Sequence, residues 1–94
     1  MSKTIDQLTF TAFDLETTGL IPVREKVVEI AAVKFNLEGI LEEKSALVNP
    51  LIPMPIEAER VHKISDEMVK GKPKVGEILG DFKALFDADV IVGH

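Results

Sequence analysis

The fold of this chain is decided by residues 13–19, which read Phe13-Asp14-Leu15-Glu16-Thr17-Thr18-Gly19. Side chains from Thr9 to Leu15 fall alternately on two sides of the chain, which is the period of a β-strand. Asp14 and Glu16 are two positions apart, so such a strand aims both carboxylates to one side. The Thr-Thr-Gly sequence, with Pro22 soon after it, then turns the chain.

Two further strands are predicted after this turn. Val27 to Phe35 is rich in β-branched and apolar residues, which favours a strand. Asn36-Leu37-Glu38-Gly39 makes a short loop to a third strand that runs to about Asn49. The three strands are therefore expected to form an antiparallel meander.

The second half of the chain predicts helices. Prolines at positions 50, 53 and 55 stiffen an extended link, and a short helix is expected over Ile56–Lys63. Ser65 has the chemistry of the next N-cap, because its hydroxyl can accept from free backbone N–H groups. From Lys74 to Phe86 the apolar residues recur at helical spacing, which predicts one amphipathic helix packed on the sheet.

A last strand follows this helix. Val90-Ile91-Val92 is a continuous apolar run, typical of a strand buried on both faces, and it should lie parallel to an earlier strand. The fold class is therefore α/β, with a mixed sheet of three antiparallel strands, a parallel fourth and flanking helices. Because the chain stops at His94 just as this strand finishes, we expect it to be truncated.

Composition narrows the class of protein. The 94 residues are 46% hydrophobic, enough for one compact domain. No apolar run approaches the roughly 18 residues that a membrane span needs, and no signal peptide is evident, so we expect a cytoplasmic protein without membrane contact. The absence of cysteine excludes disulfides and thiolate metal sites. A net charge of −5 argues against bulk coating of nucleic acid, although five basic residues between Arg60 and Lys74 could form a local positive rim.

Asp14 and Glu16 are the strongest chemical signal in the sequence. Two carboxylates about 4 Å apart repel by roughly 4 kcal/mol at an effective dielectric constant of 20, and a divalent cation removes that cost. Carboxylate oxygens suit a hard cation such as Mg²⁺ or Mn²⁺. Spacing alone leaves open that both residues are solvated strand-end groups.

Several separate blocks of the sequence resemble a known family. Phe-Asp-Leu-Glu-Thr-Thr-Gly-Leu, followed by Val-Glu-Ile-Ala-Ala-Val-Lys, resembles the first motif of the DnaQ-like 3′→5′ exonucleases, the DEDD superfamily related to the epsilon subunit of DNA polymerase III. The match continues through residues 47–50, 61–69 and 91–94. It departs from the family pattern at Lys63, where the family's Val-His-Gly-Ile has glycine.

The resemblance implies a ribonuclease H-like fold, of which residues 1–94 would be the N-terminal part of a single 3′→5′ exonuclease domain. Asp14 and Glu16 would help to hold two divalent cations, Mg²⁺ or Mn²⁺, that hydrolyse phosphodiester bonds by a two-metal mechanism. The implied substrate is a single-stranded or frayed 3′ end of DNA, and DNA polymerase III subunits are possible partners in proofreading or repair.

The resemblance also implies a nucleotide-binding set beside the catalytic pair. Glu57 would accept a hydrogen bond from the 3′-hydroxyl, while Val61 and His62 would pack against the terminal base or sugar. The pocket of the terminal nucleotide would be lined, around Asp14 and Glu16, by Leu15, Thr17 and Thr18.

Each assignment has an alternative that the sequence leaves open. Glu57 could simply stabilise a helix N-terminus, and His62 could be a packing residue. Glu29 is expected to be structural. An RNA-trimming exonuclease of the same superfamily and a non-catalytic module that binds a polymerase or nucleic acid are the competing functions. The remaining family ligands would lie beyond His94, so we expect the isolated chain to have little or no activity.

Overall fold

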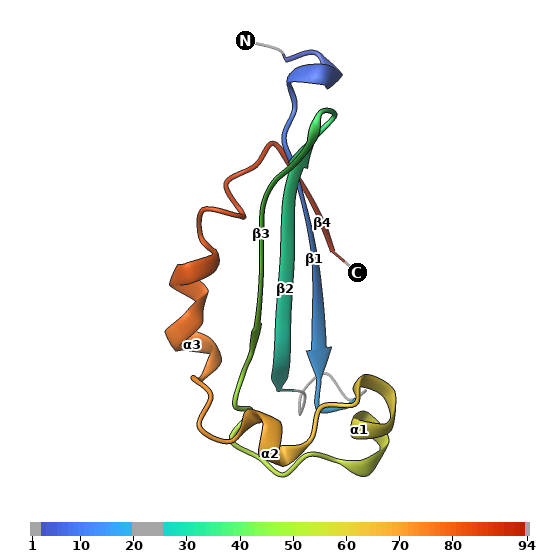
Figure 1. Cartoon of the computed structure of the whole chain (residues 1–94), viewed down its shortest axis with the longest axis vertical. Helices are drawn as coiled ribbons and strands as arrows, with labels where there is room; N and C mark the ends of the chain where they lie inside the picture. Colours follow the sequence, from blue (N-terminus) through green and yellow to red (C-terminus); the bar gives the residue numbers. More distant parts are fainter. Residues whose placement is uncertain (1–2, 20–25, 94) are drawn as a thin grey trace.

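The computed structural model describes residues 3–19 and 26–93. Its four-stranded sheet has the order β3-β2-β1-β4 (Figure 1). The strands are β1 (Phe10–Thr17), β2 (Val27–Asn36), β3 (Gly39–Leu47) and β4 (Val90–Gly93), preceded by a 3-10 turn, η1 (Ile5–Gln7). β1 pairs antiparallel with β2 and parallel with β4, and β2 pairs antiparallel with β3. The predicted meander with a parallel fourth strand is confirmed.

The helical segments are short. They are α1 (Ile56–His62), α2 (Asp66–Val69), α3 (Val75–Ile78) and the 3-10 segment η2 (Leu79–Phe82). Ser65 caps α2 as predicted, since its hydroxyl oxygen accepts from the Met68 N–H at 3.4 Å. The predicted turn proline, Pro22, lies outside the described residues.

One face of the sheet carries the core. Ile30 and Ala32 of β2 pack there with Phe82 and Leu85, and both of the latter are almost fully buried. In a second cluster, Val28 packs with Met54 of the proline-containing link, Ile64 of the segment before α2, and Val69 of α2. The sheet is therefore covered on this face by the segment from α2 to η2.

The single helix predicted over Lys74–Phe86 is wrong in its continuity. The chain forms one α-turn in α3, continues as η2, and then makes hydrogen-bonded turns through Phe86. Gly76 and Gly80 fall within this segment, and each glycine disfavours helix by about 1 kcal/mol relative to alanine. The predicted packing of the apolar residues on the sheet is nevertheless confirmed, because Ile78, Phe82 and Leu85 are buried.

The prediction that β4 is buried on both faces is also wrong. Val90, Ile91 and Val92 are 36%, 50% and 53% exposed. The reason is position, because β4 is an edge strand whose one neighbour in the described sheet is β1. No helix in the described part of the chain has the length and apolar character needed to cross a membrane.

Candidate active site

β1 presents Asp14 and Glu16 on the face of the sheet that lacks the core. Phe13 packs against the core cluster and meets the Phe86 ring edge-on, with centroids 5.6 Å apart. Thr11, two residues earlier, donates its hydroxyl to the Leu85 carbonyl on the same side. Strand alternation therefore turns Asp14 and Glu16 to the opposite face. Asp14 is exposed there and Glu16 is half-buried.

Strand pairing brings another carboxylate beside Glu16. Glu29 of β2 lies directly opposite Glu16 in the antiparallel register, so both side chains stand on the same face. The register shifts just after this pair, because Thr17 pairs with Val27 and the pairing skips Val28 of β2. Glu29 is a charged residue inside an apolar strand and was expected to be structural. Its place opposite Glu16 depends on the register of β1 with β2, which neither strand shows alone.

The Thr-Thr-Gly turn is closed by its own hydrogen bonds. The Lys26 N–H donates to the Thr18 hydroxyl oxygen and the Thr18 N–H donates to the Lys26 carbonyl, both at 3.0 Å. The Thr17 hydroxyl donates to the Gly19 carbonyl, also at 3.0 Å. Thr18 is 3% exposed. These contacts fix the backbone that follows Glu16.

Leu15 lies on the same side of β1 as Phe13 and is 37% exposed. The structure does not bring its side chain to the face of the two carboxylates. Of the residues predicted to line a nucleotide pocket, Leu15 can therefore share that face only through its backbone.

Helix α1 carries the other predicted nucleotide contacts. Glu57 and Val61 are four residues apart and thus neighbours on one side of the helix, and both are exposed, Val61 to 80%. Ala58 is the buried residue that anchors the helix. An apolar side chain as exposed as Val61 is free to contact a ligand.

His62 is the last residue of α1, and one hydrogen bond fixes which ring nitrogen carries its proton. Its Nδ1 accepts from the Ile64 N–H at 3.0 Å. This bond needs the lone pair at Nδ1, so the neutral ring carries its proton at Nε2. Nε2 is buried and has no hydrogen-bond partner among the described residues. His62 therefore holds a donor for which the described part of the chain supplies no acceptor.

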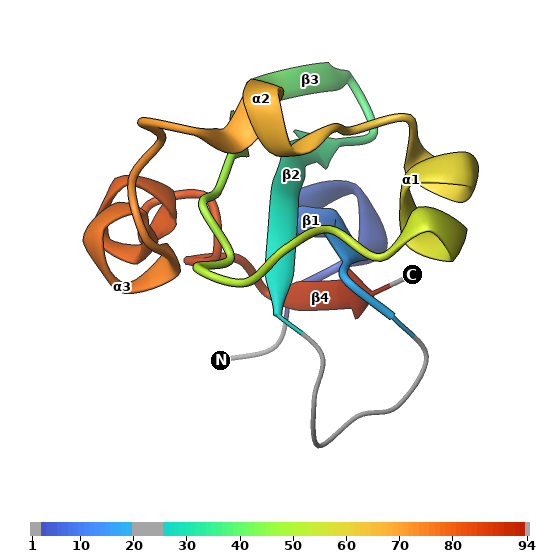
Figure 2. The same ribbon diagram turned by 90° about the horizontal axis from the view of Figure 1, so that it is seen from below.

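The two views of the ribbon place α1 relative to the carboxylates. In Figure 2 the sheet is seen end-on, with α3 on one side and α1 on the other. Both views put α1 near the end of the sheet at which β1 finishes. The structure thus brings Glu57, Val61 and His62 to the side of the sheet toward which Asp14 and Glu16 point.

The residue after α1 adopts an unusual backbone conformation. Lys63 is the C-cap, with φ 63° and ψ 20°, and its N–H donates to the Glu59 carbonyl at 2.7 Å. Glycine is the usual residue in this left-handed position because it has no Cβ. This geometry explains the glycine that the family pattern carries where this chain has lysine.

The basic residues predicted to form one rim are divided between two places. Arg60 and Lys63 belong to α1 and its cap, whereas Lys70, Lys72 and Lys74 follow α2 along the segment that leads to α3. Only the first group lies on the side of the sheet that bears Asp14 and Glu16.

The donor chemistry of Asp14 and Glu16 fits a hard divalent cation, because both offer carboxylate oxygens from one face of one strand. Among residues 3–19 and 26–93, no group of three or more His, Cys, Asp or Glu side chains could hold a metal ion. The pair is therefore a partial ligand set that fits the predicted cation.

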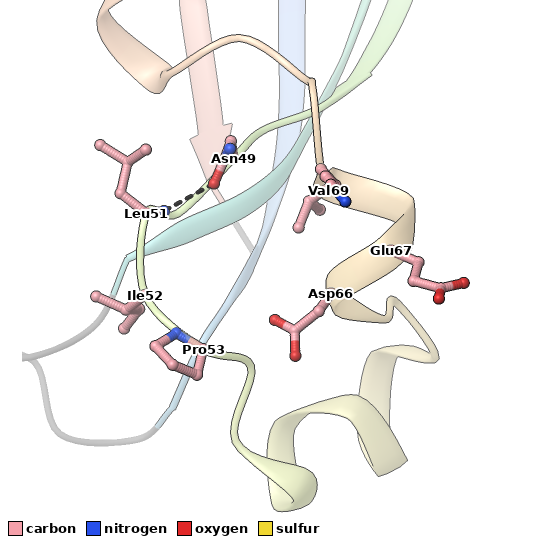
Figure 3. Close-up of a pocket in the computed structure, with 8 residues that line it drawn as sticks. Asn49, Leu51, Ile52, Pro53, Asp66, Glu67 and Val69 are labelled. Carbon is pink, nitrogen blue, oxygen red and sulfur yellow. Dashed lines mark hydrogen bonds between the residues drawn. The ribbon is translucent and has the colours of Figure 1, made fainter.

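A pocket of about 420 Å³ lies between the 49–53 link and α2 (Figure 3). The Asp66 carboxylate points into it and accepts from the Met54 N–H at 2.8 Å, while Glu67 points away. Leu51 lines it with φ 64°, in a turn that Asn49 closes by accepting from the Leu51 N–H. None of the predicted site residues lines this pocket, and it was not predicted from the sequence.

Comparison with known proteins identifies relatives of this chain. The RNase T family model, described as Exonuclease, matches residues 11–94. The DNA polymerase III subunit epsilon of Treponema pallidum is 37% identical over 89 residues, which are 95% of this chain and 41% of that protein. The PolC-type DNA polymerase III of Bacillus subtilis is 32% identical over 92 residues, covering 98% of this chain and 6% of that protein.

Solved structures share the fold. Exonuclease X in complex with 5′-overhanging duplex DNA superposes with a TM-score of 0.74 at 29% identity, over 90% of this chain and 48% of that one. A product-bound exonuclease I has a TM-score of 0.78 at 21% identity, over 94% and 22% of the two chains. The predicted ribonuclease H-like fold class is confirmed. The chain spans less than half the length of the curated relatives and solved structures described here.

Proposed function

The chain belongs to the exonuclease family, and from this premise we propose that it forms part of a 3′→5′ exonuclease domain acting on DNA. The observation that carries the proposal is the joint placement of two elements. Asp14 and Glu16 lie near the end of β1, and their side chains point to the face of the sheet without the core. Helix α1 lies on that side, with an exposed Val61 and with His62, whose buried Nε2 has no partner among the described residues. One side of the sheet thus combines acidic oxygens with groups able to hold a nucleotide.

Asp14 and Glu16 are proposed to hold two divalent cations, Mg²⁺ or Mn²⁺, together with ligands from outside residues 1–94. Such cations, when bound, supply an activated water and neutralise charge on the reacting phosphate. The hydrogen bonds of the Thr17-Thr18-Gly19 turn fix the backbone that directly follows Glu16. Residues 1–94 would then be the N-terminal part of one exonuclease domain.

The residues of α1 would position the 3′-terminal nucleotide. Glu57 can accept from its 3′-hydroxyl, and Val61, on the same side of the helix, offers an apolar surface to the base or sugar. Apolar contact of this kind is independent of base identity, as removal of successive nucleotides requires. The Nε2–H of His62 supplies a donor for an acceptor on the nucleotide.

The proposed substrate is a single-stranded or frayed 3′ end of DNA. Relatives that are named as a subunit of DNA polymerase III and as PolC-type polymerases support action in the cytoplasm beside a replicative polymerase, where proofreading needs such an activity. Exonuclease X, solved with duplex DNA, supports DNA over RNA as the substrate.

The proposal is tested with the intact gene product and 3′-labelled single-stranded DNA in Mg²⁺ or Mn²⁺, with an RNA strand of the same sequence in parallel. We expect release of nucleoside 5′-monophosphates from DNA. Asp14→Asn should lower the rate more than about 100-fold, because changing even the partners of metal ligands costs about 10–100-fold.

The matched control is Asp81→Asn, which removes the same charge from η2, a segment packed on the covered face of the sheet. Asp81→Asn should leave the rate unchanged. Equal activity of Asp14→Asn and the unaltered protein would refute the assignment, and preferential degradation of the RNA strand would favour the RNA-trimming alternative.

A further inference from the structure

Lys63 occupies a backbone position that disfavours lysine. Its φ of 63° and ψ of 20° lie in the left-handed region, where the Cβ of an L-residue crowds the following carbonyl. The cap hydrogen bond, from the Lys63 N–H to the Glu59 carbonyl, would form equally well with glycine. The fold therefore gains nothing from a Cβ at this position, and the lysine calls for another explanation.

Stabilisation of the helix terminus does not supply that explanation. A cation near the C-terminus of a helix interacts favourably with the helix dipole. The last turn of α1 already contains the cation Arg60, and α1 has only seven residues. The helix dipole at this terminus is therefore weak, and Arg60 already offsets it.

Placement on the molecule gives the lysine a role. Lys63 is exposed, and so is Arg60, three residues before it on α1. Arg60 belongs to α1 and Lys63 is its C-cap, and α1 lies on the Asp14 and Glu16 side of the sheet (Figure 2). The chain as a whole carries a net charge of −5, so an approaching polyanion is repelled unless cations stand beside the acidic face.

We propose that the Lys63 ammonium binds a backbone phosphate of the DNA strand whose 3′ end enters the site, with Arg60 beside it. This inference rests on the proposed function. The C-terminal end of α1 lies on the side of the sheet that bears Asp14 and Glu16, so a lysine at this cap position places its ammonium where a DNA strand bound at the two carboxylates would pass. The contact is independent of sequence, as is expected of a phosphate contact.

The test measures binding, without cleavage, of a short 3′-fluorescent single-stranded DNA to the protein in EDTA over a range of salt concentrations. Lys63→Gly should weaken binding about fivefold to tenfold at 50 mM salt and lower the salt slope by about 0.7, the value for one phosphate contact on single strands. The same variant should melt about 2–6 °C higher, because the left-handed strain is relieved. Loss of binding together with a gain of stability cannot come from a damaged fold.

Two control variants sharpen the result. Lys63→Arg keeps the charge and should retain both affinity and salt slope. Lys83→Gln removes one charge from the exposed turn after η2, on the α3 side, and should change neither. If Lys63→Gly binds DNA as the unaltered protein does, Lys63 has no phosphate contact, whereas an unaltered protein that fails to bind DNA at all would overturn this inference. Activity that persists in Asp14→Asn would instead overturn the proposed function, so the two failures are distinguishable.

Discussion

At the scale of single residues, some members of the candidate site can be predicted from the sequence, whereas Glu29 joins it only through the pairing of β1 with β2. The Asp14 and Glu16 pair is readable from strand alternation, whereas the roles proposed for Glu57, Val61 and His62 rest on the family resemblance. The position of Glu29 is readable from neither. It depends on the register of β1 with β2, which local sequence does not specify.

This register makes a prediction about charge. Glu16 and Glu29 stand directly opposite each other, and like charges in such a pair are destabilising. Without divalent cations, Glu29→Gln should raise the free energy of unfolding by about 0.2–1 kcal/mol, the range for cross-strand pairs. Chemical denaturation in EDTA measures the change.

A double-mutant cycle separates this repulsion from other effects of the substitution. Because one neutral partner already removes the repulsion, Glu16→Gln combined with Glu29→Gln should gain no more than either change alone. Glu43→Gln on β3, which faces Val33 rather than an acid, is the control and should be near neutral. Additive gains from the two changes would show that the carboxylates do not interact.

At the scale of elements, apolar periodicity predicts burial better than it predicts helix type. The stripe from Val75 to Phe86 buries Ile78, Phe82 and Leu85, yet the backbone switches from α3 to η2. Periods of 3.0 and 3.6 residues place nearly the same side chains on one face over such a short segment. We attribute the switch from α-helix to 3-10 helix to Gly76 and Gly80, because glycine disfavours the α-helix.

Alanine at these two glycines should therefore extend and stabilise the helix. An added Cβ meets no atom within 4 Å at Gly76 or at Gly80. Each substitution should raise the free energy of unfolding by about 0.4–1 kcal/mol, by lowering the entropy of the unfolded chain, and should increase the helical circular dichroism signal. Gly71→Ala is the counterpart, because Gly71 has φ 81° and should lose stability. A loss of stability in Gly76→Ala or Gly80→Ala would mean that the 3-10 turn is needed for packing.

At the scale of the whole molecule, the chain is elongated, with extents of 48 × 23 × 22 Å. Its radius of gyration of 15.4 Å exceeds the roughly 12 Å expected of a compact domain of this length. The sequence could not show this, because hydrophobic runs such as Val90-Ile91-Val92 predict burial without saying what covers them. The exposure of β4 is the largest difference between the predicted and the observed fold.

Asp89 links the segment before β4 to the segment before β1. Its carboxylate accepts from the Thr9 N–H at 2.9 Å, from the Thr9 hydroxyl at 3.1 Å and from the Lys3 ammonium at 3.1 Å. The hydrogen bond from the Thr9 backbone, followed by that from Lys3, holds the pKa of Asp89 below its ordinary value of 3.8. These contacts fix the start of β4 beside the start of β1.

Asp89→Ala should therefore lower the melting temperature at neutral pH, with a deficit that depends on pH. A carboxyl group whose pKa is lower in the folded than in the unfolded state contributes stability that is fully present above the unfolded pKa. That contribution is lost as pH falls from about 3.8 through the folded pKa, so the unaltered protein and the variant should converge there. Asp87→Ala, two residues earlier and exposed, should show a smaller deficit at neutral pH. A deficit of Asp89→Ala that stays constant from pH 7 to pH 2 would show that the charge of Asp89 does not stabilise the contact between the segments before β1 and β4.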